Sequence, residues 1–225
     1  DVSRLYDVNS STIKGGKGID TINISRLESS LLNGNIGADV LQVDYSSTSS
    51  IYGGQGEDTL NIFGSHESST ISANKDNDTI NLNAGASIVN STINGDAGND
   101  SVVLGVITSF IGSSNIKGGD GNDTINGSAA TVGITTNGND GNDTISGGTA
   151  ADVLNGGAGN DSITSGTGTD TLTGGLGADF LYKNTTGAST LTGNQGADQF
   201  RLNTTAGSNT VADFADGFDL ITLFD

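Results

Sequence analysis

Short segments in which apolar and polar residues alternate recur along the chain. In Thr59-Leu60-Asn61-Ile62, Leu60 and Ile62 share one face, and Thr59 and Asn61 share the other. The same pattern occupies residues 21–24, 40–43, 79–82 and 101–104. A period of two predicts short β-strands that bury one face. Each strand buries apolar side chains worth roughly 3–6 kcal/mol, but ordering each repeat costs more than that, so the apolar core alone should not hold the fold.

A six-residue turn of the form Gly-Gly-x-Gly-x-Asp precedes these strands and recurs throughout the chain. One clear copy is Gly118-Gly119-Asp120-Gly121-Asn122-Asp123, and Ile125 follows its Asp by two residues. An aliphatic residue or Phe stands at that place after every copy. The Asp residues at the sixth turn position are Asp20, Asp39, Asp58, Asp78, Asp100, Asp123, Asp143, Asp152, Asp161, Asp170, Asp179 and Asp198.

The second turn position carries only Gly, Asn or Asp, although Ser and Thr are abundant elsewhere. These three residue types tolerate a positive φ angle best, so a left-handed backbone is expected there. A disordered Gly-rich tract has no reason for this restriction, and the pattern favours a folded solenoid. The residues at this position are Gly16, Asn35, Gly54, Asn74, Asp96, Gly119, Asn139, Gly148, Gly157, Gly166, Gly175 and Asn194.

The spacing of the turn Asp residues predicts how the coils are stacked. The steps are 19, 19, 20, 22, 23 and 20 residues from Asp20 to Asp143, then 9 residues each as far as Asp179, and finally 19. One coil with two strands and two turns takes about 18 residues. We therefore expect a "first Asp row", one residue per coil, and on the opposite side a "second Asp row" of Asp152 and Asp170 alone. The first Asp row contains Asp20, Asp39, Asp58, Asp78, Asp100, Asp123, Asp143, Asp161, Asp179 and Asp198.

The other half of each coil is rich in Ser, Thr and Asn and ends in a second strand. That strand is marked by an aliphatic residue two positions before the next turn, at Ile13, Leu32, Ile51, Ile71, Ile93, Ile116 and Leu191. The expected fold is an all-β, right-handed parallel β-roll or β-helix with its Asp turns mainly on one side. Residues 1–210 form the roll. Residues 211–225 depart from the repeat and are expected to cap its last coil.

The amino-acid composition excludes several kinds of binding site and partner. The chain has 225 residues, no Cys and no Met, with 8 Lys and Arg against 26 Asp and Glu and a formal charge of −18. The absence of Cys excludes disulfides and thiolate metal sites, and the absence of Met indicates a mature product or a fragment. Nucleic acid and membrane insertion are not expected. Acidic residues at one fixed turn position indicate cation ligands, because stacked carboxylates without a cation repel one another.

These turns, twelve in phase, resemble the nonapeptide repeat of the RTX (repeats-in-toxin) family of calcium-binding β-rolls, from about Gly15 to Leu223. The resemblance implies export from the cytosol in an unfolded state, usually by one-step (type I) secretion, and folding in extracellular calcium. It also implies ions held between equivalent turns of adjacent coils. That gives about nine sites in the first Asp row and one more at the second Asp row, since calcium takes hard oxygen ligands.

Carried onto this sequence, the resemblance assigns the metal ligands as the turn Asp carboxylates together with turn carbonyls. The carbonyls are those of Gly15, Lys17, Gly34, Ile36, Gly53, Gln55, Gly95, Ala97, Gly118, Asp120, Gly138, Asp140, Gly156, Ala158, Gly174, Leu176, Gly193 and Gln195. Three turns depart from the pattern, and in one of them Ser165 replaces the first Gly before Asp170. The turn from Ala73 to Asp78 has lost all three glycines, and Ala150 replaces the third Gly before Asp152. The weakest sites are expected in these last two turns.

Catalysis is not expected within these residues. The single His, His66, lies in a Ser-rich half-coil and is expected to be a solvated loop residue, and the basic residues are scattered. Two roles stay open. One is a secreted surface-layer or adhesin-like scaffold, with other copies of the chain or cell-surface polysaccharide as further partners. The other is the secretion and folding module of a secreted protease, lipase or polysaccharide-modifying enzyme.

Overall fold

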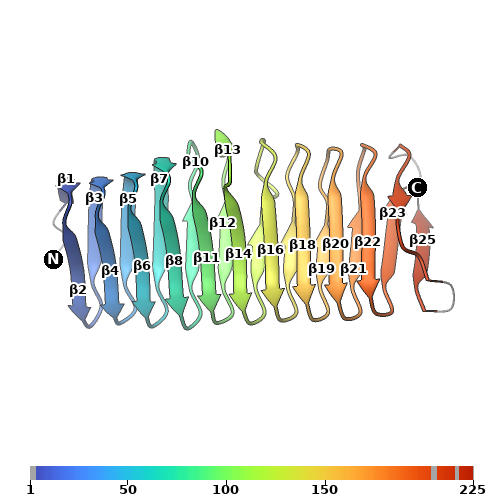
Figure 1. Ribbon diagram of the computed structural model, residues 1–225, viewed down its shortest axis with the longest axis horizontal. Helices are drawn as coiled ribbons and strands as arrows, with labels where there is room; N and C mark the ends of the chain where they lie inside the picture. Colours follow the sequence, from blue (N-terminus) through green and yellow to red (C-terminus); the bar gives the residue numbers. More distant parts are fainter. Residues whose placement is uncertain (1–3, 204–206, 216–217, 225) are drawn as a thin grey trace.

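The computed structural model describes residues 4–203, 207–215 and 218–224. Within these ranges the chain forms strands, turns and bends, and none of it is a helix that could cross a membrane. The strands alternate between two parallel sheets, so that the chain winds as a long solenoid with its ends at opposite extremes (Figure 1). The predicted fold, a parallel all-β solenoid, is confirmed.

The first sheet has 14 strands. Twelve follow one another along the axis: β1 (Arg4–Asn9), β3 (Thr21–Glu28), β5 (Val40–Ser47), β7 (Thr59–Glu67), β9 (Thr79–Leu82), β12 (Ser101–Leu104), β15 (Thr124–Asn126), β17 (Thr144–Ser146), β19 (Ser162–Thr164), β21 (Phe180–Lys183), β23 (Gln199–Asn203) and β25 (Leu220–Phe224). Two more, β10 (Ser87–Val89) and β13 (Ser109–Ile111), come from the two longest coils and continue the upper end of β7.

The second sheet has 11 strands. They are β2 (Thr12–Lys17), β4 (Leu31–Ile36), β6 (Ser50–Gln55), β8 (Thr70–Lys75), β11 (Thr92–Ala97), β14 (Asn115–Asp120), β16 (Thr135–Asp140), β18 (Val153–Ala158), β20 (Thr171–Leu176), β22 (Thr190–Gln195) and β24 (Thr210–Val211). The turns of the first Asp row lead from this sheet to the first sheet, along the lower edge of the solenoid in Figure 1.

Equivalent aliphatic side chains stack along the axis and form the core. In the first sheet Leu41 pairs with Leu60, and Leu60 pairs with Ile80. These residues are fully buried, whereas Thr59 and Asn61 between them face outward, as the alternating pattern predicted. The core is therefore a thin layer between two sheets, and each coil contributes its own side chains to that layer.

The prediction for His66 was wrong. Its side chain is fully buried, because β7 extends to Glu67 and places residue 66 on the inward face, in register with Ser46 and Ile88. Nδ1 lies 2.7 Å from the Ser46 hydroxyl, and Nε2 lies against the Phe63 carbonyl. Burial lowers the pKa of His66 to about 4, so the ring is neutral near pH 7.

The C-terminal segment adds one more coil. Val211 of β24 lies on Leu191, and Ile221 of β25 lies on Phe200, so the segment covers the preceding coil. Phe200 is buried as a result, whereas Phe218 and Leu223 are exposed. The boundary at residue 211 stays a prediction.

Candidate metal centre

The backbone of the Asp turns is left-handed where the sequence indicated. Position two has a positive φ angle in eleven turns, with values from 68° at Asn194 to 129° at Gly119. The exception is Gly148, where the prediction was wrong. Ala150, two residues later, also lacks a positive φ, although position four has one in the other turns. Because a Cβ disfavours the left-handed region, Ala150 gives the turn before Asp152 a different path.

From Asp39 onward, each carboxylate of the first Asp row is hydrogen-bonded to the coil before it. Oδ1 accepts a hydrogen bond from the backbone N–H of the preceding Asp, over N–O distances of 2.6–2.9 Å from Asp20–Asp39 to Asp179–Asp198. This ladder fixes the orientation of the side chains, so every carboxylate points the same way along the axis.

The second oxygen, Oδ2, is left without a partner. In all ten residues of the first Asp row this atom is buried and accepts no hydrogen bond from the protein. A buried carboxylate oxygen without a donor is costly. One such oxygen per coil, in a line, indicates that a cation completes the row.

A space beside each of these oxygens is preserved by the Gly at turn position one. A Cβ on Gly118 would lie 2.2 Å from Oδ2 of Asp123 and 2.6 Å from the carbonyl oxygen of Gly138 in the next coil. These Gly residues do not have positive φ angles, so space and not backbone conformation explains them. Gly15, Gly34, Gly53, Gly95, Gly138, Gly156, Gly174 and Gly193 have the same close approach to the Asp of their own turn.

The turn from Ala73 to Asp78 departs from this arrangement. Ala73 supplies a methyl group at position one and is fully buried. Oδ2 of Asp78 is nevertheless unpartnered, as in the other coils. Burial, followed by the nearby carboxylates, raises the pKa of Asp78 to about 8, the highest in the row. The metal ligand predicted at Asp78 thus lies in line with its neighbours, with less space around it.

From Asp39 onward, burial raises the pKa of the other carboxylates of the first Asp row as well, against the opposing effect of the backbone N–H donor. The pKa of Asp123 is raised to about 7. Burial also raises the pKa of Asp39, Asp143 and Asp198, and it brings the pKa to about 6 in Asp58, Asp100, Asp161 and Asp179. A cation at these oxygens would reverse the shift, because it favours the ionised form.

The predicted carbonyl ligands at position three face the neighbouring turn. The carbonyl oxygen of Asp140 accepts a hydrogen bond from the N–H of Gly121 over 2.7 Å, and Ile36, Gln55, Asp120, Ala158, Leu176 and Gln195 accept equivalent bonds. A carbonyl oxygen has a second lone pair for a metal. Within the described ranges no three Asp, Glu or His side chains converge on one point. A cation in this row would therefore be held largely by main-chain oxygens.

The two residues of the second Asp row differ from those of the first, because both of their Oδ2 atoms have protein partners. Oδ2 of Asp152 accepts a hydrogen bond from the N–H of Gly148 over 2.7 Å. Oδ2 of Asp170 lies 2.9 Å from the ammonium group of Lys183, whose side chain is fully buried. Burial raises the pKa of Asp152 to about 6, although Lys183 acts in the opposite sense.

A serine ladder on the same side as the second Asp row was not predicted. Its members are Ser30, Ser49, Ser69, Ser91 and Ser114, and each hydroxyl accepts from the N–H of the equivalent residue one coil earlier. Ser91 also donates to the carbonyls of Val89 and His66, over 2.9 and 3.2 Å. The signal was present in the sequence, since each Ser stands two residues before an inward Ile or Leu, as the turn Asp does.

Two further features close and support the first Asp row. Asp219 follows the last member of the row: its Oδ1 accepts from the N–H of Asp198 over 3.0 Å, but its Oδ2, unlike those of the ten members, accepts from the N–H of Ala215. An Asn before the turn Asp forms an outer ladder that joins successive turns, at Asn77, Asn99, Asn122, Asn142 and Asn160.

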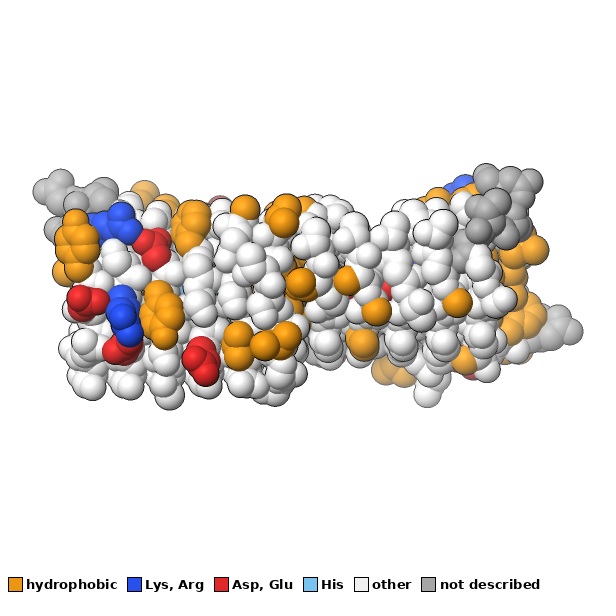
Figure 2. Space-filling view, turned by 90° about the horizontal axis from the view of Figure 1, so that it is seen from above, with side chains coloured by type: hydrophobic (Ala, Val, Ile, Leu, Met, Phe, Trp, Pro, Cys, Tyr) orange, Lys and Arg blue, Asp and Glu red, His pale blue; other side chains and the backbone are white. Residues whose placement is uncertain are grey.

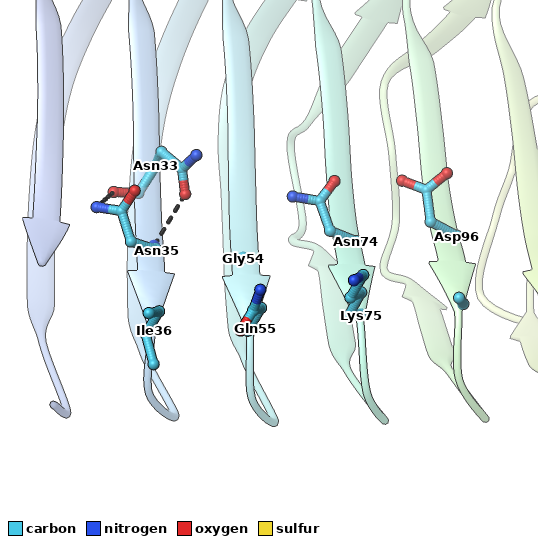
Figure 3. Close-up of a pocket in the computed structure, with 9 residues that line it drawn as sticks. Asn33, Asn35, Ile36, Gly54, Gln55, Asn74, Lys75 and Asp96 are labelled. Atoms are coloured by element: carbon cyan, nitrogen blue, oxygen red, sulfur yellow. Dashed lines mark hydrogen bonds between the residues drawn. The ribbon is translucent and has the colours of Figure 1, made fainter. Parts of the chain in front are cut away.

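The outer surface differs between the two sides. Beside the first Asp row, a shallow groove crosses the second sheet, and the side chains of Asn35, Asn74 and Asp96 at turn position two line it with Gly54 between them (Figure 3). On the opposite side, Figure 2 shows charged side chains gathered near the N-terminal end and uncharged surface over the middle coils. The ten carboxylates of the first Asp row lie inside the turns and not on this outer surface.

The fold and these turns define a parallel β-solenoid with a row of oxygen-lined sites suited to a hard cation. A family model of the RTX calcium-binding nonapeptide repeat matches residues 49–61, 62–89, 90–106, 110–130, 137–172 and 146–181, more than half of the chain. The chain belongs to this family of calcium-binding repeats. No curated protein matches it.

Proposed function

We propose that the first Asp row is a stack of calcium sites whose filling completes the fold. The observation that carries this proposal is the row of ten buried Oδ2 atoms without a protein donor. The donors are all hard oxygens, and calcium accepts six to eight of them in flexible geometry. When bound, calcium would supply the positive charge that neutralises adjacent carboxylates.

The residues that would hold each ion are defined by position in the turn. Oδ2 of the Asp and the position-one carbonyl of the next coil border the same small space. The carbonyls at positions two and four are further candidates, and they were not among the predicted ligands. In the turn before Asp170 these two carbonyls, of Gly166 and Gly168, converge with Oδ2 on one cation, the Lys183 ammonium. Turns of the first Asp row share the positive φ angles at both positions.

We propose further that the domain is secreted and folds outside the cell, where it serves as part of a surface-layer or adhesin-like scaffold. Affinities of about 10⁻⁴–10⁻³ M are typical of extracellular calcium modules, and sites in that range would fill only where calcium is abundant. The role is structural and not catalytic in this proposal, because His66 is buried and neutral and the row of acids is explained by calcium.

The test is far-UV circular dichroism during a calcium titration that starts from chelated protein, with native mass spectrometry to count the ions. We expect a cooperative gain of sheet signal over a metal-free state that has less sheet and melts at a lower temperature, together with the uptake of several ions. A spectrum that is already sheet-like in chelator and does not change with calcium would overturn the proposal.

The scaffold role is tested separately by sedimentation and electron microscopy in calcium. Ordered self-association that chelator reverses is the expected result. A monomer at all calcium concentrations, joined in the same polypeptide to a catalytic domain, would favour the role of a folding module in a secreted enzyme.

A further inference from the structure

We propose that Lys183 takes the place of a calcium ion in the second Asp row, so that this side of the solenoid is closed without metal. This inference rests on the proposed calcium sites of the first Asp row, and it restricts calcium binding to that row. It assigns Asp170, predicted from its sequence as a metal ligand, to an internal ion pair.

The contacts of the ammonium group are those expected of a bound cation. Nζ lies 3.1 Å from the carbonyl oxygen of Gly166, 3.0 Å from that of Gly168 and 2.9 Å from Oδ2 of Asp170. These are positions two, four and six of one Asp turn. An ammonium group has three donors, and all three are used.

Lys183 reaches this position from the core. It is the inward residue of β21 that follows Leu181, and it lies in register with Leu202 of the next coil. Its side chain is fully buried. A buried ammonium is stable only when it is paired and fully hydrogen-bonded, so the chain supplies both the cation and its ligands.

The Asp and Ser residues that join coils on this side of the solenoid also have hydrogen-bond partners within the protein and need no cation. The N–H of Asp170 donates to the hydroxyl of Ser189, 2.9 Å away, where the first Asp row would have another carboxylate. Asp152 has N–H donors on both oxygens, from Ile134 and Gly148. In the N-terminal coils the serine ladder makes the same inter-coil bonds with neutral hydroxyls.

The experiment counts bound calcium ions by native mass spectrometry in Lys183→Met, which keeps the length of the side chain and removes its charge. At saturating calcium we expect one more ion per chain than in the original protein, and the double variant Lys183→Met/Asp170→Asn should lose that extra ion. Lys117→Met, on the outer face of β14, is the matched control for the change in net charge, and its ion count should equal that of the original protein.

A second comparison applies if Lys183→Met does not fold. Asp170→Asn should leave the ion count unchanged, whereas Asp161→Asn in the first Asp row should lower it by at least one. An unchanged count in folded Lys183→Met, or a lower count in Asp170→Asn, would overturn the inference and leave the calcium sites of the first Asp row standing. If the original protein binds no calcium at all, the proposed function fails, and the inference fails with it.

Discussion

From Asp39 onward, each Asp of the first row uses its two oxygens for two different tasks. Oδ1 holds the backbone N–H of the preceding Asp, and Oδ2 remains buried and free for a cation. The ladder therefore orders the carboxylate without neutralising it. In the absence of calcium, only a proton can neutralise the buried carboxylate. Burial accordingly raises the pKa to about 7 at Asp123 and to about 8 at Asp78.

This division predicts an unusual pH dependence of the metal-free protein. The folded-state pKa values lie above the unfolded value of 3.8, so the folded state holds more protons between pH 4 and about 7, and stability falls as pH rises through that window. His66 acts in the opposite sense, because its folded pKa of about 4 lies below 6.5, but it is one group against many. In chelator, we expect a melting temperature at pH 5 at least about 2–4 °C above that at pH 8, the shift for roughly 1 kcal/mol in a chain of this size.

Saturating calcium should reverse that order, because protons compete with the metal for the same oxygens. Melting curves at pH 5 and pH 8, with and without calcium, measure both effects. A metal-free protein that is more stable at pH 8 than at pH 5 would contradict the assignment of the buried carboxylates.

The Gly at turn position one predicts a second effect at the scale of a residue. In Gly118→Ala the new methyl group would meet Oδ2 of Asp123 and the carbonyl of Gly138. Overpacking of this kind costs about 1–3 kcal/mol, and we expect the loss of at least one bound ion by native mass spectrometry. Thr124→Ala, at an exposed position beside the same turn, is the control and should change neither the ion count nor the stability by more than about 0.5 kcal/mol.

At the scale of the element, one coil has two turns that are closed by different chemistry. In the coil that contains β11, Ser91 closes one turn with its hydroxyl and Asp100 closes the other with its carboxylate. Both side chains occupy the same place relative to the strand that follows, two residues before its inward aliphatic residue. The backbone ladder is thus common to the two sides, and only the charge differs.

Ser91→Ala and Asp100→Asn should separate these two roles within a single coil. Ser91→Ala leaves the buried N–H of Ser69 without its acceptor, which costs about 1–3 kcal/mol, and it should leave the ion count unchanged. Asp100→Asn keeps an oxygen for the N–H of Asp78 but removes the charge. It should lower the ion count by one or more and raise the melting temperature in chelator. Equal ion counts in the two variants would show that carboxylate charge does not determine binding.

The sequence predicted the features that repeat with a fixed period. The strands, the inward aliphatic residues and the first Asp row follow from alternation and spacing, as at Leu60 and Asp58. What it missed depends on register within less regular segments. His66 and Lys183 are polar residues on inward positions, and their burial becomes clear only when β7 and β21 are known to extend to Glu67 and Lys183. The serine ladder was missed because Ser is common throughout the polar half-coils, which hid its fixed place before Ile or Leu.

At the scale of the whole molecule, each coil contacts only its neighbours, so stability depends on adjacent pairs of coils. Hydrogen exchange in calcium should therefore be slowest in the middle, around β14 and β15, and faster toward β1 and β2 at one end and β24 and β25 at the other. In chelator the protection should fall along the entire array, because the first Asp row passes through every part of it. Uniform exchange from end to end in calcium would contradict this description.

Ser91, Asp100 and the Asp170 of the Lys183 ion pair all accept the same kind of inter-coil hydrogen bond. The number of calcium sites in such an array can therefore change while its backbone stays the same. Exchange of one Asp for Ser at this turn position converts a coil that needs an ion into one that does not. The length of the coil, its inward aliphatic residue and its neighbouring coils stay the same. The demand for calcium is thus a property that can be set coil by coil, independently of the shape of the rod that the coils build.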